Sequence, residues 1–282
     1  NVNQGNNGGG REISGTLINQ GAVNVNRGAN LTLNFKGAFT NFSTLKIDSL
    51  QTMLLNGNTY VFNQNAGTIA GNGLLELQNG ATMNFTSGAT TGTNPPLLSR
   101  GNLNFGPPAT GRATFIMRGS PSHLSGDIGA EQIVWLRGDG TYTNATVTAK
   151  NNFKNAGVIR LESLSGWGSM LNLDSTLTNT GLIHASNPRS TGRREIAGRM
   201  LNRGVLTIDS LQTLHALGAL FKNDSGGVMQ GKGTLNVQGT TFTNAGEFRP
   251  GTSPGILSIT GLFPQTATGA LSTEIGGLTV GR

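Results

Sequence analysis

The sequence predicts an all-β fold, a right-handed parallel β-helix, because one turn phrase recurs at a steady interval and each copy is followed by alternating apolar residues. The phrase is an apolar residue, any residue, Asn, any residue and Gly, as in Phe-Thr-Asn-Ala-Gly at residues 242–246. Its asparagines recur at steps of 21 to 24 residues, and the gap in mid-chain holds four further steps. Such a repeat without helical patterning is typical of solenoids, whose coils bury their apolar faces on one another, and about 12 coils of 21–24 residues are expected.

The strands are predicted by the segments that follow the phrase. Val-Ile-Arg-Leu at 158–161 and Val-Leu-Thr-Ile at 205–208 alternate with period two and are bounded by Gly and Asn. This pattern is the signal of a short strand with one buried face. The alternate apolar residues are therefore expected to form one continuous core, which includes Leu45, Ile47, Ile159, Leu161, Leu206, Ile208, Leu235 and Val237.

The repeated asparagines are expected to form a structural ladder at one corner of the coils. Stacked amides can hydrogen-bond along the axis, and Asn tolerates the left-handed backbone of a tight corner. The glycine two places on is expected to supply a positive φ. The alternative is that the row binds a ligand such as a carbohydrate or ice. The ladder is assigned to Asn19, Asn41, Asn65, Asn155, Asn179, Asn202, Asn223 and Asn244.

The chain is expected to be one domain with two irregular parts. Residues 1–10 are rich in Asn, Gln and Gly and are predicted to be a flexible lead-in, whereas residues 11–282 form a single elongated solenoid. Around residues 86–140 the pattern weakens, and prolines occur at 95–96, 107–108 and 121. Proline cannot donate to a strand ladder, so longer loops are expected there. Loops on a rigid scaffold often carry a binding site.

Composition limits the partners and the chemistry. Only 12% of the residues are charged, the formal net charge is +7, and there is no cysteine, which excludes a disulfide framework and a thiol catalyst. No apolar run reaches 18 residues, so we expect no membrane insertion. Aromatic residues are few and are not interleaved with basic runs, so nucleic acid is not an expected partner. A candidate patch for polyanions, or else a solvated loop, is formed by Arg189, Arg193, Arg194, Arg199 and Arg203.

Catalysis, cofactors and metals are not expected. The thirteen carboxylates are scattered, and the nearest pair in sequence is Asp127 and Glu131, with His123 and Asp139 close by. Stacking of coils would also bring Asp48 towards Glu76, although isolated surface charges are the simpler interpretation. The three histidines, His123, His184 and His215, lack metal-ligand spacing, and calcium-binding nonapeptides are absent from the sequence.

The end of the chain carries a resemblance. Residues 248–261, Phe-Arg-Pro-Gly-Thr-Ser-Pro-Gly-Ile-Leu-Ser-Ile-Thr-Gly, resemble the PGxSPGxLxIxG phrase of autotransporter passenger domains and of exported bacterial proteins with a PEP-CTERM sorting tail. Residues 269–277 resemble the strand that follows this phrase, and the Asn-x-Gly coils are similar to filamentous haemagglutinin-type adhesins. The resemblance implies a β-solenoid that is secreted, on the cell surface or in the extracellular matrix. Neither a translocator barrel nor a sorting tail is present in the sequence.

These observations predict a structural or adhesive extracellular rod, a subunit or segment of a surface fibre, filament or biofilm matrix. Open strand edges at both ends predict end-to-end self-association or continuation into further coils. An acidic polysaccharide or cell-surface glycan is the other expected partner. The alternatives are a polysaccharide-binding or polysaccharide-degrading β-helix and an ice-binding module, although Thr-x-Thr pairs of the kind that ice binding uses, such as Thr141 and Thr143, are scattered along the sequence.

Overall fold

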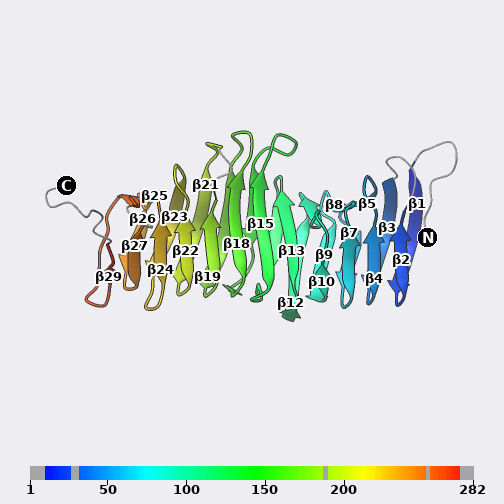
Figure 1. Ribbon diagram of the computed structural model, residues 1–282, viewed down its shortest axis with the longest axis horizontal. Coiled ribbons are helices and arrows are strands. Elements are labelled where there is room, and N and C mark those ends of the chain that lie inside the picture. The colour runs from blue at the N-terminus through cyan, green and yellow to red at the C-terminus, as the bar shows by residue number, and fades with distance from the viewer. Residues whose placement is uncertain (1–9, 27–31, 187–189, 252–254, 274–282) are drawn as a thin grey trace, which may run out of the picture.

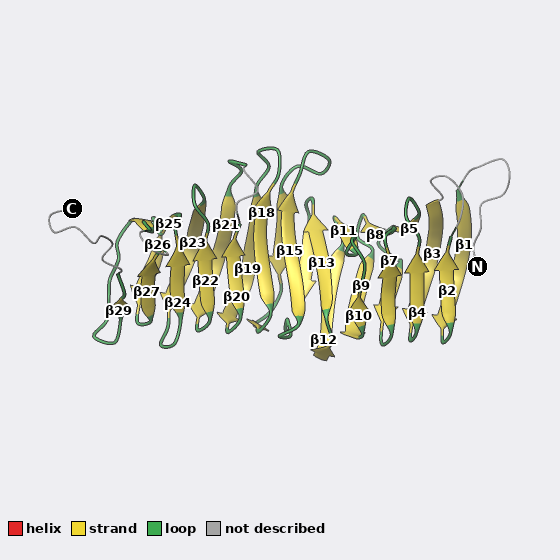
Figure 2. Cartoon of the chain, in the orientation of Figure 1, coloured by secondary structure: helices red, strands yellow, loops and turns green. Residues whose placement is uncertain are grey.

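The computed structural model describes residues 10–26, 32–186, 190–251 and 255–273. These residues form an all-β rod without a helix, in which parallel strands lie in stacked coils of a β-solenoid (Figures 1 and 2). The solenoid has about 11 turns, close to the number predicted, so the predicted fold class is confirmed. Residues 1–9 of the expected lead-in lie outside the described residues.

Two sheets run along the rod. The smaller consists of β2 (Ala22–Val25), β4 (Thr44–Ile47), β7 (Thr68–Gly71) and β10 (Ala89–Thr90). The 25-stranded sheet consists of β1 (Arg11–Asn19), β3 (Thr32–Asn41), β5 (Thr52–Asn56), β6 (Val61–Gln64), β8 (Leu74–Gln78), β9 (Thr82–Ser87), β11 (Leu97–Ser99), β12 (Asn102–Thr110), β13 (Ala113–Arg118), β14 (Ser122–Ser125), β15 (Gln132–Gly138), β16 (Ala145–Ala149), β17 (Phe153–Asn155), β18 (Val158–Ser163), β19 (Ser169–Asn179), β20 (Leu182–Ala185), β21 (Arg194–Asn202), β22 (Val205–Ile208), β23 (Thr213–Asn223), β24 (Val228–Gly231), β25 (Thr234–Asn236), β26 (Thr240–Asn244), β27 (Glu247–Pro250), β28 (Ser258–Thr260) and β29 (Ala270–Leu271).

Strand pairing keeps equivalent residues of successive coils in register. The strand β1 pairs in parallel with β3 from Arg11 opposite Leu33 to Asn19 opposite Asn41, with no shift between them. The strands β22 and β24 pair in the same way, from Val205 opposite Val228. Because the register is shared, a residue type that recurs at the coil interval becomes a column along the rod.

The inward-facing residues form one continuous apolar core, as predicted. All eight expected core residues have side chains that are at most 2% exposed. Aromatic rings add local columns to this core, such as Phe39 stacked on Phe62 with ring centres 5.0 Å apart. Buried apolar side chains are the main source of stability in such a coil, because each coil can exclude water only by packing on its neighbours.

The glycine of the repeat phrase has a different role from the one predicted. Gly181 and Gly204 do not adopt a positive φ, so that expectation is wrong for these coils. A Cβ atom on Gly181 would instead overlap the backbone oxygen of Gly157, and one on Gly204 would overlap that of Gly181. Glycine is therefore required because two coil backbones approach each other closely at this corner.

The middle coils depart from the regular pattern. The strand β12 keeps its register with β9 up to Phe105, and the register shifts between Phe105 and Thr110. The Pro107–Pro108 and Ser120–Pro121 peptide bonds in this part are cis. The interrupted pairing leaves the segment after Phe105 free to leave the coil surface, and this segment borders the groove described below.

Candidate functional site

The first three coils share a row of buried side-chain amides. Asn19 Nδ2 donates to Asn41 Oδ1 at 2.7 Å, and Asn41 Nδ2 donates to Gln64 Oε1 at 2.9 Å. The third member is Gln64, which pairs in register with Asn41, and not Asn65, so the prediction was wrong by one residue. In β6 the inward side chains are those of Phe62 and Gln64, and the period of two places Asn65 outside this row.

A second row of amides runs through the later coils. Asn155 donates to Asn179 at 2.7 Å, Asn179 to Asn202 at 2.7 Å, Asn202 to Asn223 at 2.8 Å, and Asn223 to Asn244 at 2.7 Å. All five residues are completely buried. We call the two rows, Asn19 to Gln64 and Asn155 to Asn244, the inner amide ladders.

Both inner amide ladders point the same way along the rod. In every link the N–H of the earlier coil donates to the oxygen of the later coil. Backbone carbonyls fix this direction, because the amide nitrogen of Asn179 also donates to Val205 O, and that of Asn202 to Gly204 O. Only an NH₂ group can make these contacts, so the ladder has a donor end and an acceptor end.

Apolar side chains occupy the same corner between the two ladders. Phe85 pairs in register with Gln64, Phe105 pairs in register with Phe85, and Ile128 forms a β-bridge with Asn155. The Phe85 and Phe105 rings have centres 6.0 Å apart and meet edge to face. The corner of the middle coils is therefore held by apolar packing and not by a buried amide row.

An outer row of polar side chains crosses these same middle coils. Asn84 donates to Asn63 at 2.8 Å, Asn104 donates to Asn84 at 2.9 Å, and Ser125 donates to Asn104 at 2.6 Å. These side chains face outward and are half-buried. The hydrogen-bonded row thus moves from the inside of the rod to its surface, where the repeat phrase loses its asparagine.

The predicted arginine patch is only partly a surface feature. Arg194 is 1% exposed, and its guanidinium donates to the backbone carbonyls of Ser186 and Gly192. It joins the insertion between β20 and β21 to the first residue of β21, so assigning it to a polyanion patch was wrong. Burial lowers the pKa of Arg194 to about 10. Arg189 lies outside the described residues.

The remaining arginines of that patch are exposed, and two of them are already paired. Arg193 contacts Glu195 at 2.7 Å, and Arg203 contacts Asp224 at 2.9 Å. Arg199 has an exposed side chain and no ion pair among the residues described. Paired carboxylates cancel much of the positive potential here, so the surface is less suited to a polyanion than the sequence suggests.

A charged cluster that the sequence did not predict lies on the middle coils. Arg118 contacts Glu76 at 3.0 Å and Asp139 at 3.1 Å, and its Nε donates to Ser99 at 2.8 Å. Strand pairing sets Glu76 beside Leu54 and Asp48 pairs with Lys46, so the suggested Asp48 and Glu76 pair does not form. Arg118 is shared between the two nearly buried carboxylates, which suits a structural network.

A similar arrangement follows in the next coils. The buried Glu162 accepts from Arg137 at 2.8 Å and from Arg160 at 3.3 Å. Both guanidinium groups lie near the Trp135 ring, at 3.8 and 4.4 Å from its centre, where cation–π attraction stabilises them. The charges of this cluster are also largely compensated within the protein.

The other candidate catalytic groups are not brought together. No hydrogen bond among the described residues joins Asp127 to Glu131, whose side chain is exposed. His184 lies 2.9 Å from Asp209. Burial and, to a smaller extent, Arg193 lower the pKa of His215. Within the described ranges, no group of three His, Cys, Asp or Glu residues is arranged to hold a metal ion.

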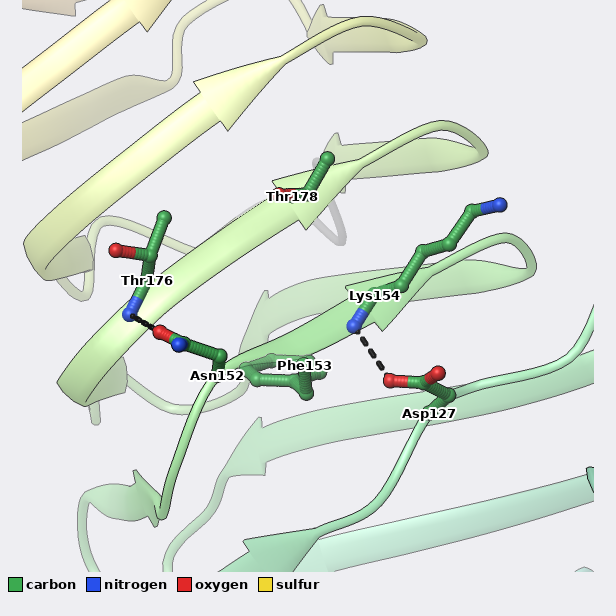
Figure 3. Close-up of a pocket in the computed structure, with 6 residues that line it drawn as sticks. All are labelled: Asp127, Asn152, Phe153, Lys154, Thr176 and Thr178. Carbon is green, nitrogen blue, oxygen red and sulfur yellow. Dashed lines mark hydrogen bonds between the residues drawn. The ribbon is translucent and has the colours of Figure 1, made fainter. Parts of the chain in front are cut away.

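A groove crosses from the middle coils, where the inner amide ladder is absent, onto the coils of Asn155 and Asn179, where it begins again. It consists of two adjoining pockets, of about 640 and 450 Å³, which share Asp127 and Lys154. The larger pocket is bordered by Phe105, the Pro107–Pro108 segment and Ile128, whereas Asn152, Thr176 and Thr178 line the smaller one (Figure 3). We call this feature the Asp127 groove.

Two hydrogen bonds fix the polar rim of the Asp127 groove. The carboxylate of Asp127 accepts from the backbone N–H of Lys154 at 2.8 Å, and Asn152 Oδ1 accepts from the backbone N–H of Thr176 at 3.0 Å (Figure 3). The Lys154 amine has no ion pair among the described residues and ends an exposed side chain. The rim thus offers one carboxylate, one ammonium group, an amide and two hydroxyls.

The fold and these sites define a β-solenoid of stacked parallel coils. No protein-family model, curated protein or solved structure among those compared matches the chain. In the described part of the chain, no helix has the length and apolar character needed to span a membrane.

Proposed function

We propose that this protein is a structural or adhesive rod that acts outside the cell or at its surface, as a subunit or segment of a fibre, filament or biofilm matrix. The observation that carries the proposal is the common direction of the inner amide ladders. Within each inner amide ladder the amide N–H of one coil donates to the amide oxygen of the next, so a coil added at either end would continue the row in the same direction. A further coil of the same chain and a coil of a second copy can both continue the amide row in this direction.

The two ends of the described rod are complementary. At the first described coil, Asn19 Oδ1 accepts from Gly21 N–H at 3.2 Å and from no side-chain amide among the described residues. At the last coil, Asn244 reaches Gln265 Oε1 at 3.5 Å, and Gln265 Nε2 donates to Gly269 O at 2.9 Å. An acceptor at one end and a donor at the other favour head-to-tail contact, which propagates as a filament and does not close as a dimer.

Cysteine cross-linking tests this arrangement, because the native chain has no cysteine. Asn244 stands opposite Gln265, so a further coil in register would place Ile18 of a second copy beside Pro264. Neighbouring strands lie about 4.8 Å apart, and a disulfide can join such positions. A mixture of the single variants Ile18→Cys and Pro264→Cys should form mixed dimers on oxidation, and the double variant should form a series of oligomers.

The single variants also serve as controls. Each alone should stay monomeric on oxidation, since like ends do not meet in a head-to-tail contact. Dimers of Ile18→Cys alone would indicate head-to-head contact. A monodisperse monomer in light scattering and electron micrographs at all concentrations, without mixed cross-links, would rule out self-association.

A second candidate function is polysaccharide binding, which the Asp127 groove favours because it joins an apolar wall to a polar rim. We propose binding without cleavage. Glycoside hydrolysis normally uses two carboxyl groups about the scissile bond, and Asp127 is the single carboxylate among the described residues that line the groove. Release of reducing ends or unsaturated products from a glycan, abolished by Asp127→Asn or Glu131→Gln, would overturn this.

A further inference from the structure

Two glycines border the Asp127 groove at points where the coils are closely packed. Gly126 has φ +81°, and a Cβ atom there would overlap the backbone oxygen of Phe105. A Cβ atom on Gly129 would press on the side chain of Gln132, 2.9 Å away. Glycine at these positions therefore lets the chain segments beside Phe105 and Ile128 approach each other closely.

The wall and rim of the groove combine two kinds of surface. Pro107, Pro108 and Ala109 supply apolar atoms on one side, whereas the side chains of Phe105 and Ile128 are buried in the core. Along the continuation over the next coils, Thr176 and Thr178 supply hydroxyls, and both are half-buried. A chain of sugar rings has the matching character, because each ring carries apolar C–H faces and a hydroxyl-rich edge.

The charge of the rim selects among extended ligands. One exposed carboxylate and one exposed ammonium group give no net charge, so a polyanion gains little there and is repelled by Asp127. An extended peptide that adds to a sheet needs free backbone groups. The strands beneath the groove do not offer them, because β17 is paired with β19, and β19 with β21.

We propose that the Asp127 groove binds a neutral polysaccharide chain that lies across successive coils. This deepens the adhesive role proposed above and rests on it. The apolar wall at Pro107 and Pro108 packs against the ring faces, and Asp127 accepts hydrogen bonds from ring hydroxyls. Thr178 hydrogen-bonds the same chain one coil further along the rod.

Affinity electrophoresis of the full chain tests the proposal. The probes are three neutral polysaccharides (a mixed-linkage β-glucan, a galactomannan and an α-mannan), with alginate and polygalacturonate as acidic ones. At least one neutral polysaccharide should retard the protein, and Asp127→Ala and Thr178→Val should each raise the dissociation constant five- to tenfold. Thr178→Val keeps the shape of the side chain, so this variant should fold.

The matched control is Thr243→Val. Thr243 lies in the same outward column as Thr178, connected through Leu201 and Lys222, but is not part of the groove. Thr243→Val should bind the polysaccharide as the native chain does. The thermal unfolding midpoints of Asp127→Ala, Thr178→Val and Thr243→Val should be compared with that of the native chain.

Any of four outcomes would overturn the proposal, and the first three concern what binds and how the variants behave. They are retardation by the acidic polysaccharides alone, binding of an extended peptide in place of a glycan, and neutral-glycan binding that is unchanged by Asp127→Ala and Thr178→Val. Absence of any retardation would do the same. The binding assay does not require filaments, so the two proposals can fail separately. If Ile18→Cys cross-links with Pro264→Cys as expected but no glycan binds, the groove proposal is wrong and the rod proposal is unaffected.

Discussion

The side-chain amide of Asn179 donates a hydrogen bond of 2.7 Å to Oδ1 of Asn202, and neither residue is exposed to solvent. Asn202 passes the contact on to Asn223 at 2.8 Å and also donates to the carbonyl of Gly204. A buried amide is costly unless its donors and acceptor are satisfied, and repetition satisfies them for Asn179 and Asn202, whereas Oδ1 of the first member, Asn155, has no partner among the described residues. The hydrogen bonds between buried amides of neighbouring coils therefore explain the Asn at these turns without a ligand.

Replacing one member of the ladder should destabilise the rod strongly. Asn202→Ala leaves the NH₂ of Asn179 and the oxygen of Asn223 without their partners, and we expect a loss of about 2 to 4 kcal/mol in the free energy of unfolding. Denaturant unfolding followed by circular dichroism measures this loss. Asn65→Ala is the control and should change stability by less than about 0.5 kcal/mol, because Asn65 lies outside the inner ladder. Equal effects of the two variants would contradict the assignment.

The corner glycines should tolerate no side chain inside the stack. Gly181→Ala places a methyl group against the backbone of the preceding coil, and we expect it to cost about 1 to 3 kcal/mol. Gly21 has the same place in the first repeat phrase, but a Cβ atom there meets nothing within 4 Å. Gly21→Ala should therefore be nearly neutral in thermal unfolding. If both variants lose stability equally, the close approach of coils is not the reason for the glycine.

Acid should weaken one ion pair of the later coils in a defined pH range. Hydrogen bonds from Lys222 and then Arg203 lower the pKa of Asp224 from 3.8 to about 2. A lowered carboxyl pKa means that the unfolded state binds the proton more readily, so this contribution to stability is complete above pH 4 and is lost as the pH falls towards 2. Carboxyl titration by NMR should show the pKa rising in Lys222→Gln.

Lys232→Gln provides the control for this titration. Lys232 is an exposed lysine of the next coil and does not contact Asp224 among the described hydrogen bonds and ion pairs. It should leave the pKa of Asp224 in place. A normal Asp224 pKa in the native chain would contradict the role given to Lys222 and Arg203.

The fold and the core were predictable because they depend on periodicity, which a sequence displays directly. That Gln64 and not Asn65 belongs to the ladder was predictable in principle. Gln64 follows Phe62 by two residues, as Asn41 follows Phe39, so strand alternation places these side chains on the same inward face. Searching for the Asn-x-Gly phrase selected Asn65 and so missed Gln64. Whether a residue is an even or an odd number of positions from a core residue of the same strand is thus a better guide to a stacked column than the identity of the turn residue.

Other features depend on spacing that the repeat does not specify. Glu76 and Arg118 are 42 residues apart, and coil lengths in this part vary, so their contact could not be read from a fixed step. Arg194 was misplaced because burial depends on how the insertion folds back over the coil. The Asp127 groove was missed because it reflects the loss of a pattern, at Phe105 and Ile128, and its signal is the interruption of the Asn series.

That interruption has a mechanical consequence. On either side of it, buried and directional amide contacts resist the sliding or parting of coils, whereas the middle relies on apolar packing at the corner and on an outer row that water can reach. Dispersion forces have no preferred direction, so these central coils should bend and yield first when the rod is pulled or sheared. The compliant segment carries the larger pocket of the Asp127 groove and the stiffer coils carry the smaller one, so tension along the rod would change the shape of that groove.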